Sequence, residues 1–259
     1  MDRRTRFSLA QNYALYYGYG RTQELARYDV AVVEPNGHTS NSLQTLKAAG
    51  TLLIAYLSVM EVPPWSKDLS KLKAKDFLHL EGQPYVHQEF GNYWVDLKSP
   101  RWRRILLERV SYLLGDAGYD GVFLDTVGYV ESGKLSPSIR IELQEAATKF
   151  VRQIRQRFTG SLIVQNCGLE QLLKQTAGYI DGVCWENPPF GQAASRDWVA
   201  FMVRSLEQLK RVYGLQILLL VEEDHAKTVN LRMIEQVATD KQFLLYSAPS
   251  AYTAGVTKM

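Results

Sequence analysis

Two short segments of this chain carry the residues whose types and spacing are best suited to chemistry. Asp120-Gly-Val-Phe-Leu-Asp125 and Asp181-Gly-Val-Cys-Trp-Glu186 share Asp-Gly-Val, and each segment ends on a carboxylate. The residues between are typical of a buried strand, where a terminal carboxylate is costly unless it is paired or used. Two acids at equivalent ends of two strands therefore predict general acid/base chemistry at one face of a sheet or barrel.

Eight apolar segments of strand length recur along the chain and must position these acids. Their hydrophobic runs are continuous, as expected of parallel strands that are buried on both faces. We predict these strands at 14–18, 28–35, 51–58, 121–126, 161–166, 182–187, 216–223 and 242–248.

Helical segments separate the predicted strands. The clearest begin at Ser99-Pro100, at Ser136-Pro137 and after Ser195, and they end before Gly118, at about Phe158 and at Gly214. Eight strand-helix units in about 250 residues predict an α/β fold, a single (β/α)8 or TIM barrel over residues 1–259. An open doubly wound sheet is the alternative, but the chain lacks the Gly-rich nucleotide-binding turn of that fold.

Side-chain alternation predicts which of the strand-end residues face the barrel axis. Phe123 and Asp125 share one face of their strand, as Cys184 and Glu186 do, so both acids are expected to point inward. In such barrels catalytic groups lie at the C-terminal ends of the strands. Further polar groups at or just after these ends are Glu34, Glu61, Asn166, Glu222, Glu223 and Tyr246. For Glu34, Glu61 and Glu223 a helix-capping or ion-pairing role is an equal alternative. Asp120 and Asp181, at the opposite ends, are predicted to form tight turns.

The segment between the third strand and the helix at Ser99 is unusually long, at about forty residues, and rich in aromatic residues. It contains Pro63-Pro64-Trp65 and Tyr93-Trp94-Val95-Asp96. Long loops in compact domains are often functional. Two interpretations stay open: Trp65 and Trp94 stack against flat ligand faces such as sugars, or the segment is a structural lid on the barrel mouth.

Composition restricts the class of protein. The formal charge of +3 is too small to indicate nucleic-acid binding, and no apolar run is long enough to span a membrane. The two cysteines, Cys167 and Cys184, are interpreted as small core residues, and the four dispersed histidines predict no metal site. We expect no cofactor. No signal peptide is visible, so we expect a secreted protein if a leader was removed and a cytoplasmic one otherwise.

Several motifs together resemble glycoside hydrolase family 114, the endo-α-1,4-polygalactosaminidases and related barrels of the Thermotoga type. The motifs are Tyr56-Leu-Ser-Val, Glu61, Tyr93-Trp-Val-Asp96-Leu-Lys-Ser-Pro100, Gly121-Val-Phe-Leu-Asp125-Thr126, Asn166 and Trp185-Glu186-Asn187. Where the family usually has Ser-Val-Gly-Glu, this chain has Met60 in place of the glycine. The resemblance implies cleavage of α-1,4-linked galactosamine polymers by Asp125 and Glu186. It also implies substrate contacts from Tyr17, Tyr56 and Asp96, beside the strand-end and loop residues named above.

We therefore expect a glycosidase whose partner is a polysaccharide or oligosaccharide. By analogy with barrel α-glycosidases, Asp125 is the expected nucleophile and Glu186 the general acid/base. Two alternatives stay open: a non-catalytic barrel that binds cationic amino-sugar glycans, and a barrel isomerase or lyase that acts on a small metabolite.

Overall fold

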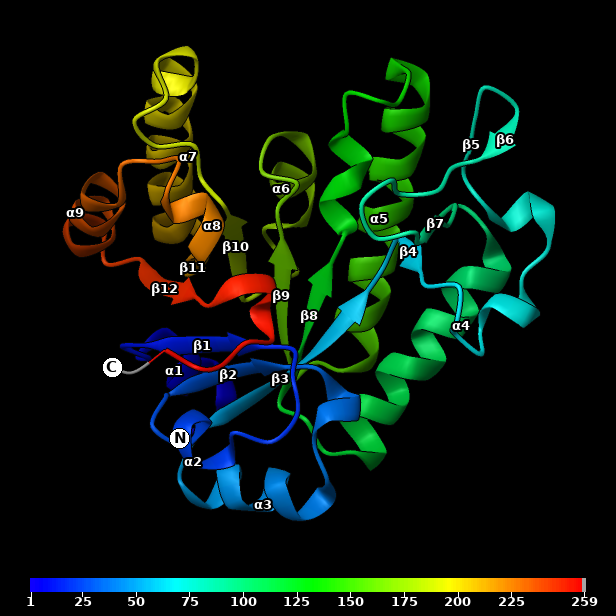
Figure 1. Ribbon diagram of the computed structural model, residues 1–259. Coiled ribbons are helices and arrows are strands. Elements are labelled where there is room, and N and C mark those ends of the chain that lie inside the picture. Colours follow the sequence, from blue (N-terminus) through cyan, green and yellow to red (C-terminus); the bar gives the residue numbers. More distant parts are fainter. Residues whose placement is uncertain (258–259) are drawn as a thin grey trace.

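Eight parallel strands form a nearly closed barrel in the computed structural model, which describes residues 1–257 (Figure 1). The strands are β1 (Tyr13–Tyr16), β2 (Val30–Val33), β3 (Leu52–Ser58), β8 (Gly121–Asp125), β9 (Leu162–Asn166), β10 (Gly182–Glu186), β11 (Gln216–Glu222) and β12 (Leu244–Ala248). They pair in that order, and β1 meets β12 where the rings of Tyr13 and Tyr246 lie 5.6 Å apart. The predicted (β/α)8 barrel is confirmed, with strand ends shifted by one or two residues.

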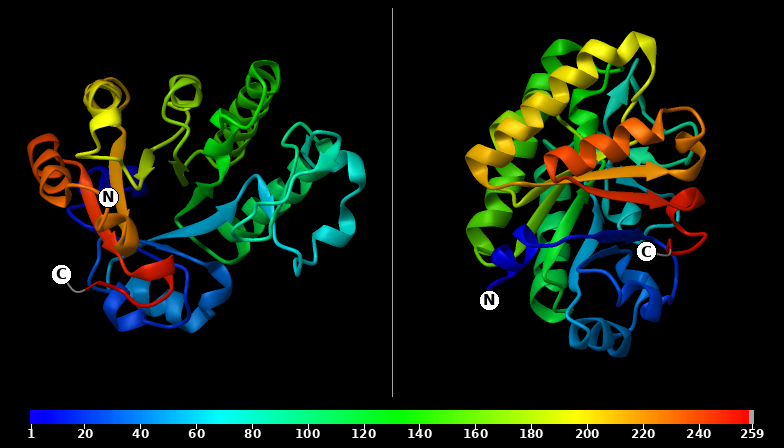
Figure 2. Two further views of the ribbon diagram at one scale, coloured as in Figure 1. Left: turned by 45° about the horizontal axis from the view of Figure 1, so that its top comes forward. Right: turned by 90° about the vertical axis from the view of Figure 1, so that its left-hand side faces the viewer.

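Helices surround the barrel, and their ends follow the sequence signals (Figure 2). They are α1 (Arg3–Ser8), α2 (Thr22–Leu25), α3 (Ser40–Ala48), α4 (Pro100–Ser111), α5 (Pro137–Arg157), α6 (Gln171–Thr176), α7 (Arg196–Tyr213), α8 (Glu223–Ala226) and α9 (Leu231–Lys241). The hydroxyls of Ser99 and Ser136 accept hydrogen bonds from the backbone at the starts of α4 and α5. Gly214 ends α7 with a φ of +70°. Among residues 1–257, no helix has the length and apolarity to cross a membrane.

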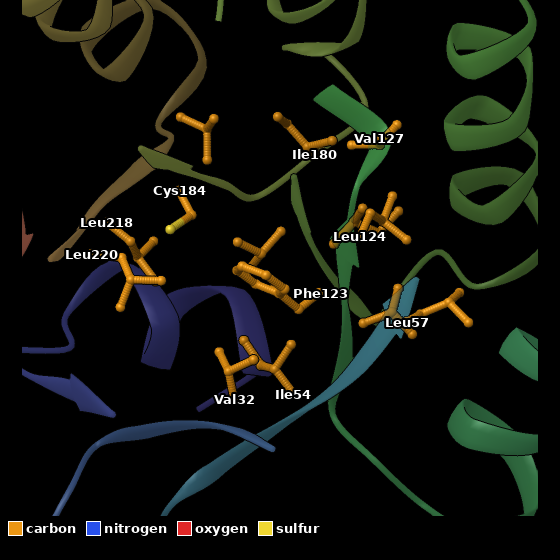
Figure 3. Close-up of a cluster of buried hydrophobic side chains, with 14 of the residues drawn as sticks. Val32, Ile54, Leu57, Phe123, Leu124, Val127, Ile180, Cys184, Leu218 and Leu220 are labelled. Atoms are coloured by element: carbon orange, nitrogen blue, oxygen red, sulfur yellow. The ribbon is translucent and has the colours of Figure 1, made fainter. Parts of the chain in front are cut away.

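Side-chain alternation along the strands separates the barrel interior from the layer beneath the helices. Phe123 of β8 lies among inward-facing side chains that include Val32 and Cys184 (Figure 3). Leu57 and Leu124 lie on the side of the strands toward the helices. All five side chains are buried, at 3% exposure or less. The expected side-chain alternation along β8 and β10 therefore holds. It directs the last residue of each strand, Asp125 and Glu186, toward the barrel axis.

The opposite end of the barrel is held together by the leading aspartates of the repeated segments. Asp120 accepts a hydrogen bond from Leu53 N (3.0 Å), and Asp181 accepts one from Ile163 N (2.8 Å). Asp120 also pairs with Arg3, and Asp181 pairs with Arg4 of α1. These acids thus tie neighbouring strands and α1 together.

The glycines after these aspartates are needed for close packing rather than for a turn. A Cβ on Gly121 would lie 2.5 Å from the backbone oxygen of Leu162, and one on Gly182 would lie 2.9 Å from that of Gln216. Neither glycine has a positive φ. The predicted tight Asp-Gly turn is corrected accordingly: each pair begins a strand that packs closely on its neighbour.

The long segment after β3 folds into small hairpins beside the barrel (Figure 2). Within it β4 (Glu61–Val62) pairs with β7 (Tyr93–Trp94), and β5 (His79–Leu80) pairs with β6 (Gln83–Pro84), all antiparallel. Met60 is fully buried, so packing accommodates its side chain. The indole of Trp94 is 2% exposed, whereas that of Trp65 is 77% exposed. Of these two indoles, that of Trp65 is the one exposed to solvent, whereas that of Trp94 is packed within the segment.

Candidate active site

Three neighbouring strands bring three polar side chains together at the C-terminal end of the barrel. Asp125, Asn166 and Glu186 are the last residues of β8, β9 and β10. The amide Nδ2 of Asn166 donates to Asp125 Oδ1 and to Glu186 Oε2, each at 2.7 Å. One amide therefore bridges the two carboxylates, and both of its protons are used.

The second oxygen of each carboxylate accepts a tyrosine hydroxyl. Tyr56 of β3 donates to Asp125 Oδ2 at 2.9 Å, and Tyr252 donates to Glu186 Oε1 at 2.5 Å. Tyr252 belongs to η7 (Ser250–Tyr252), the turn that follows β12. Tyr17 packs on both tyrosines: its ring centroid is 4.5 Å from that of Tyr56 and 5.6 Å from that of Tyr252.

The backbone changes direction sharply after each of the three strands. Thr126, Cys167 and Asn187 follow Asp125, Asn166 and Glu186, and their φ angles are +59°, +56° and +49°. Left-handed conformations cost free energy in residues other than glycine, and they cluster at functional sites because surrounding contacts enforce them.

Hydrogen bonds supply that enforcement at two of the three positions. Thr126 Oγ1 accepts from the backbone nitrogens of Val59 and Met60, at 3.1 and 2.8 Å. Asn187 Oδ1 accepts from the backbone nitrogen of Glu222 at 2.9 Å. The side chain after each acid therefore fixes the chain direction by bonding the neighbouring strand end.

Burial raises the pKa of both acids. Burial raises the pKa of Asp125, while the hydrogen bonds from Asn166 and Tyr56 act to lower it. Burial also raises the pKa of Glu186, and the negative charge of Asp125 raises it further. Because the two carboxylates repel each other, the pair holds one proton to higher pH than an isolated carboxyl group does.

The surroundings of the pair are anionic. Neither acid forms an ion pair with a lysine, arginine or histidine within the described chain. Glu222, the last residue of β11, contributes to the raised pKa of Glu186 through its charge. Glu34 lies at the rim, where its carboxylate accepts from Asn36 and its charge raises the pKa of Tyr56.

The structure brings some of the predicted substrate-binding residues to the pair and leaves others apart. Tyr17, Tyr56 and Asn166 lie at the pair, and Glu34 lies at its rim beside Tyr56. Glu61 is 5% exposed and accepts from Asn92 Nδ2 (2.8 Å) and Trp94 Nε1 (3.0 Å). These two bonds tie the β4–β7 hairpin together, and the substrate contacts expected of Glu61 and Trp94 stay predictions.

Four further residues of the predicted site form no described hydrogen bond with Asp125 or Glu186, and their substrate contacts stay predictions. Asp96 caps the turn before α4 by accepting from Lys98 N at 2.8 Å. Tyr246 is 3% exposed because its ring packs between Tyr13 and Tyr28 inside the barrel. Glu223 begins α8 and accepts from Ser250 Oγ at 3.1 Å, whereas its neighbour Glu222 ends the strand. Trp65 is exposed on the long segment, with no described contact to the pair.

Sequence reasoning missed Tyr252 and the closeness of Tyr129 to the acids. Tyr252 lies 66 residues from Glu186 in a short turn without a motif, so no local signal marks it. Tyr129 lies in η5 (Val127–Glu131), directly after β8, and stacks on Trp94 with centroids 4.6 Å apart. Burial raises the pKa of Tyr129, and the charges of Glu61 and Asp125 raise it further. Its position right after a strand-end acid was the available signal.

A barrel with inward-facing acids at its C-terminal mouth has the architecture of many glycoside hydrolases. Known structures share this fold. The glycoside hydrolase domain of PelA from Pseudomonas aeruginosa is 20% identical, with 94% of this chain and 96% of that chain covered and a TM-score of 0.76. Ega3 from Aspergillus fumigatus, solved in complex with galactosamine, is 15% identical, with coverage of 96% and 94% and a TM-score of 0.69. TtGalA, an α-galactosidase from Thermus thermophilus, is 14% identical, with coverage of 94% and 59% and a TM-score of 0.61.

Sequence comparison defines the family. The model of glycoside-hydrolase family GH114 matches residues 4–188, which is more than half of the chain. The protein therefore belongs to glycoside-hydrolase family GH114 and is a glycosidase. Comparison with curated proteins finds no match.

Within residues 1–257, no group of three or more His, Cys, Asp or Glu side chains is arranged to hold a metal ion.

Proposed function

We propose that this glycosidase hydrolyses α-1,4-linked galactosamine-containing polysaccharide with retention of configuration, with Asp125 as nucleophile and Glu186 as general acid/base. The observation that carries the proposal is the single Asn166 amide that donates to both carboxylates at 2.7 Å. The two acceptor oxygens can be no more than twice that distance apart. Retaining glycosidases place their carboxyl groups about 5–5.5 Å apart and inverting ones about 6.5–9.5 Å apart, so this spacing favours retention.

The reaction follows from the roles proposed for the two acids. An oxygen of anionic Asp125 attacks the anomeric carbon while the glycosidic C–O bond breaks, and the proton of Glu186 passes to the leaving oxygen. The product is a glycosyl ester on Asp125 and an anionic Glu186. Glu186 then takes a proton from water, whose oxygen attacks the anomeric carbon and releases the Asp125 carboxylate. The raised pKa of Glu186, caused first by burial and then by the charge of Asp125, supports its role as the proton donor.

Two observations support an amino-sugar substrate. Ega3, which shares the fold, was solved in complex with galactosamine. The mouth of the barrel carries Glu34, Asp125, Glu186 and Glu222, which favour a cationic ligand such as the ammonium group of a deacetylated galactosamine residue.

Asn166 offers a further contact for such a sugar. Its Oδ1 is buried and has no hydrogen-bond partner among the described residues. A buried acceptor without a partner is costly. A hydroxyl or ammonium group of the bound sugar would supply the missing donor beside the reacting carbon.

The test is product release from a panel of amino-sugar polymers, with α-1,4-linked galactosamine polymer as the expected substrate. Asp125→Asn and Glu186→Gln are each expected to lower release of reducing ends at least 100-fold, because each removes a group that forms or breaks bonds. Asp240→Asn, an exposed acid on α9, is the matched control and should keep full activity. Folding of each variant is checked by circular dichroism.

Proton NMR of the first-formed product tests the stereochemistry. Retention gives the α-anomer before mutarotation, and the β-anomer would contradict the assigned roles. Full activity of either acid variant would contradict the proposed site. Tight glycan binding without any cleavage by the wild-type protein would favour the alternative of a non-catalytic binding barrel.

A further inference from the structure

The turn that follows the last strand reaches back into the mouth in an unusual conformation. Ala251 and Tyr252 of η7 have φ angles of +55° and +58°, so two successive residues other than glycine are left-handed. Each costs about 1–2 kcal/mol relative to an ordinary conformation. Surrounding contacts must therefore hold this turn in place.

Side chains from β11 and α8 provide those contacts. Glu222 Oε1 accepts from Ala251 N at 3.0 Å, and Glu223 Oε2 accepts from Ser250 Oγ at 3.1 Å. The backbone oxygen of Tyr252 also accepts from Tyr17 N at 2.8 Å, at the end of β1. The turn is thus attached to both sides of the seam where the barrel closes.

The hydroxyl of Tyr252 completes a chain of hydrogen bonds around Glu186. It donates to Glu186 Oε1 at 2.5 Å and accepts from Asn187 Nδ2 at 3.4 Å. Asn187 in turn accepts from Glu222 N, and the Glu222 carboxylate holds Ala251. Every member of this chain constrains the position of the Tyr252 oxygen relative to Glu186.

We propose that Tyr252 is a positioning residue for the acid/base, in that its hydroxyl fixes the orientation of the Glu186 carboxylate and stabilises the anion left after proton transfer. This inference rests on the role assigned to Glu186 in the proposed function. The Asn166 Nδ2 group that bonds Glu186 can only donate, whereas a tyrosine hydroxyl can both donate and accept. Tyr252 can therefore stay bonded to Glu186 in both of its protonation states during the two reaction steps.

Several titratable and polar groups around Glu186 affect its protonation. The charges of Asp125 and Glu222 act on Glu186, and Asn166 and Tyr252 bond it directly. Other titratable side chains coupled to it by charge are Tyr13, Tyr17, Tyr129, Cys167 and Cys184. Within the described chain no cation is paired with it, so the Tyr252 hydroxyl is one of only two groups that bond the Glu186 anion.

Tyr252→Phe tests the proposal because it removes the hydroxyl and keeps the ring that packs on Tyr17. Loss of a donor to the anion raises the pKa of Glu186. The basic limb of the pH profile of kcat/KM should therefore move up by about one pH unit, and kcat at the optimum should fall about tenfold. KM should change little, because Tyr252 acts through Glu186.

Tyr28→Phe is the matched control. The Tyr28 hydroxyl donates to the backbone oxygen of Thr257, so this variant also loosens the C-terminal segment but leaves Glu186 untouched. It should leave the pH profile unchanged. The melting temperature of both variants is measured in parallel. A profile of Tyr252→Phe that superimposes on that of the wild type would overturn the proposal, as would an equal shift in Tyr28→Phe.

A second measurement keeps this inference separate from the proposed function. Titration of the glutamate carboxyl carbons by ¹³C NMR, with Glu186 assigned by its loss in Glu186→Gln, follows the Glu186 proton without substrate. Tyr252→Phe should raise its apparent pKa by about one unit. No change there would overturn the positioning role even if Glu186 is catalytic. If the pKa moves while Glu186→Gln keeps full activity, the proposed function fails instead.

Discussion

At the scale of single residues, the site depends on one amide held between two acids. Asn166 donates both of its protons to carboxylates that would otherwise repel each other at close range. The acids nevertheless remain buried without a paired cation, which costs free energy. The free energy of folding is therefore expected to improve when one of these charges is removed.

Glu186→Gln tests this cost by measuring stability against pH. Since the folded protein has a raised Glu186 pKa, it binds more protons than the unfolded chain above about pH 4.3. Stability of the wild type thus falls as pH rises from there through the raised pKa, and the variant lacks this fall. We expect the variant to melt about 2–4 °C higher at pH 7 and equally at pH 4.

Glu235→Gln, an exposed acid on α9, is the control for the thermal scans and should match the wild type at both pH values. A Glu186→Gln variant that melts below the wild type at pH 7 would contradict the raised pKa.

At the scale of elements, the junctions after the strands set the orientation of the strand-end acids. Thr126 joins the end of β8 to the start of the long segment, because its hydroxyl accepts from Val59 N and Met60 N. Both nitrogens are buried with the residues that carry them. The same hydroxyl lies 3.3 Å from Ser58 Oγ. One side chain thus sets the direction of the backbone next to Asp125 and the departure of the hairpins from β3.

Thr126→Val is expected to lower the free energy of unfolding by about 1–3 kcal/mol, since it keeps the shape but leaves Met60 N buried without an acceptor. Val59 N keeps its second acceptor, the backbone oxygen of Asp125, at 2.9 Å. Urea denaturation measures the change. Thr126→Ser keeps the hydroxyl and should lose less than half as much. Equal losses in the two variants would show that packing of the methyl group, rather than the hydroxyl, holds this junction.

At the scale of the whole molecule, the acids at the two ends of the barrel differ in how their charges are paired. The C-terminal end carries carboxylates without paired cations, whereas Asp181 at the other end pairs with Arg4 and Arg155. The side chains of Asp181 and Arg155 are 10% and 13% exposed, so screening by water is limited. The repeated segments thus place one acid at a stabilising end and one at the end where we propose the reaction.

Asp181→Ala is expected to destabilise the protein by about 3–5 kcal/mol, because it leaves Arg155 buried without its partner and Ile163 N without its acceptor. Activity per folded molecule should not change. Asp224→Ala breaks an ion pair with Lys227 whose side chains are 68% and 67% exposed, and it should cost at most about 1 kcal/mol. Urea denaturation and turnover are measured on the same samples. A loss of turnover in folded Asp181→Ala would contradict the separation of the two ends.

The barrel and the catalytic candidates could be predicted from the sequence because their signals are local. A continuous apolar run predicts a buried parallel strand, and the alternation within 121–126 directs Asp125 inward with Phe123. The same alternation along β11 favours Glu222 over Glu223, since Glu222 shares a face with Leu218 and Leu220. The expectation for Glu223 departed from that rule, and Glu223 lies at the start of α8, where it accepts from Ser250.

What the sequence alone determined is therefore the set of strands and the acids at their ends, because side-chain periodicity depends on residues a few positions apart. Only the tertiary structure decided which groups touch these acids. Tyr252 meets Glu186 across 66 positions, and Trp94 meets Glu61 across 33. Such contacts depend on how the barrel closes at β1 and β12 and how the long segment folds back. No local pattern encodes either event, so the hydrogen-bond partners that orient and tune the two carboxylates emerge only in three dimensions.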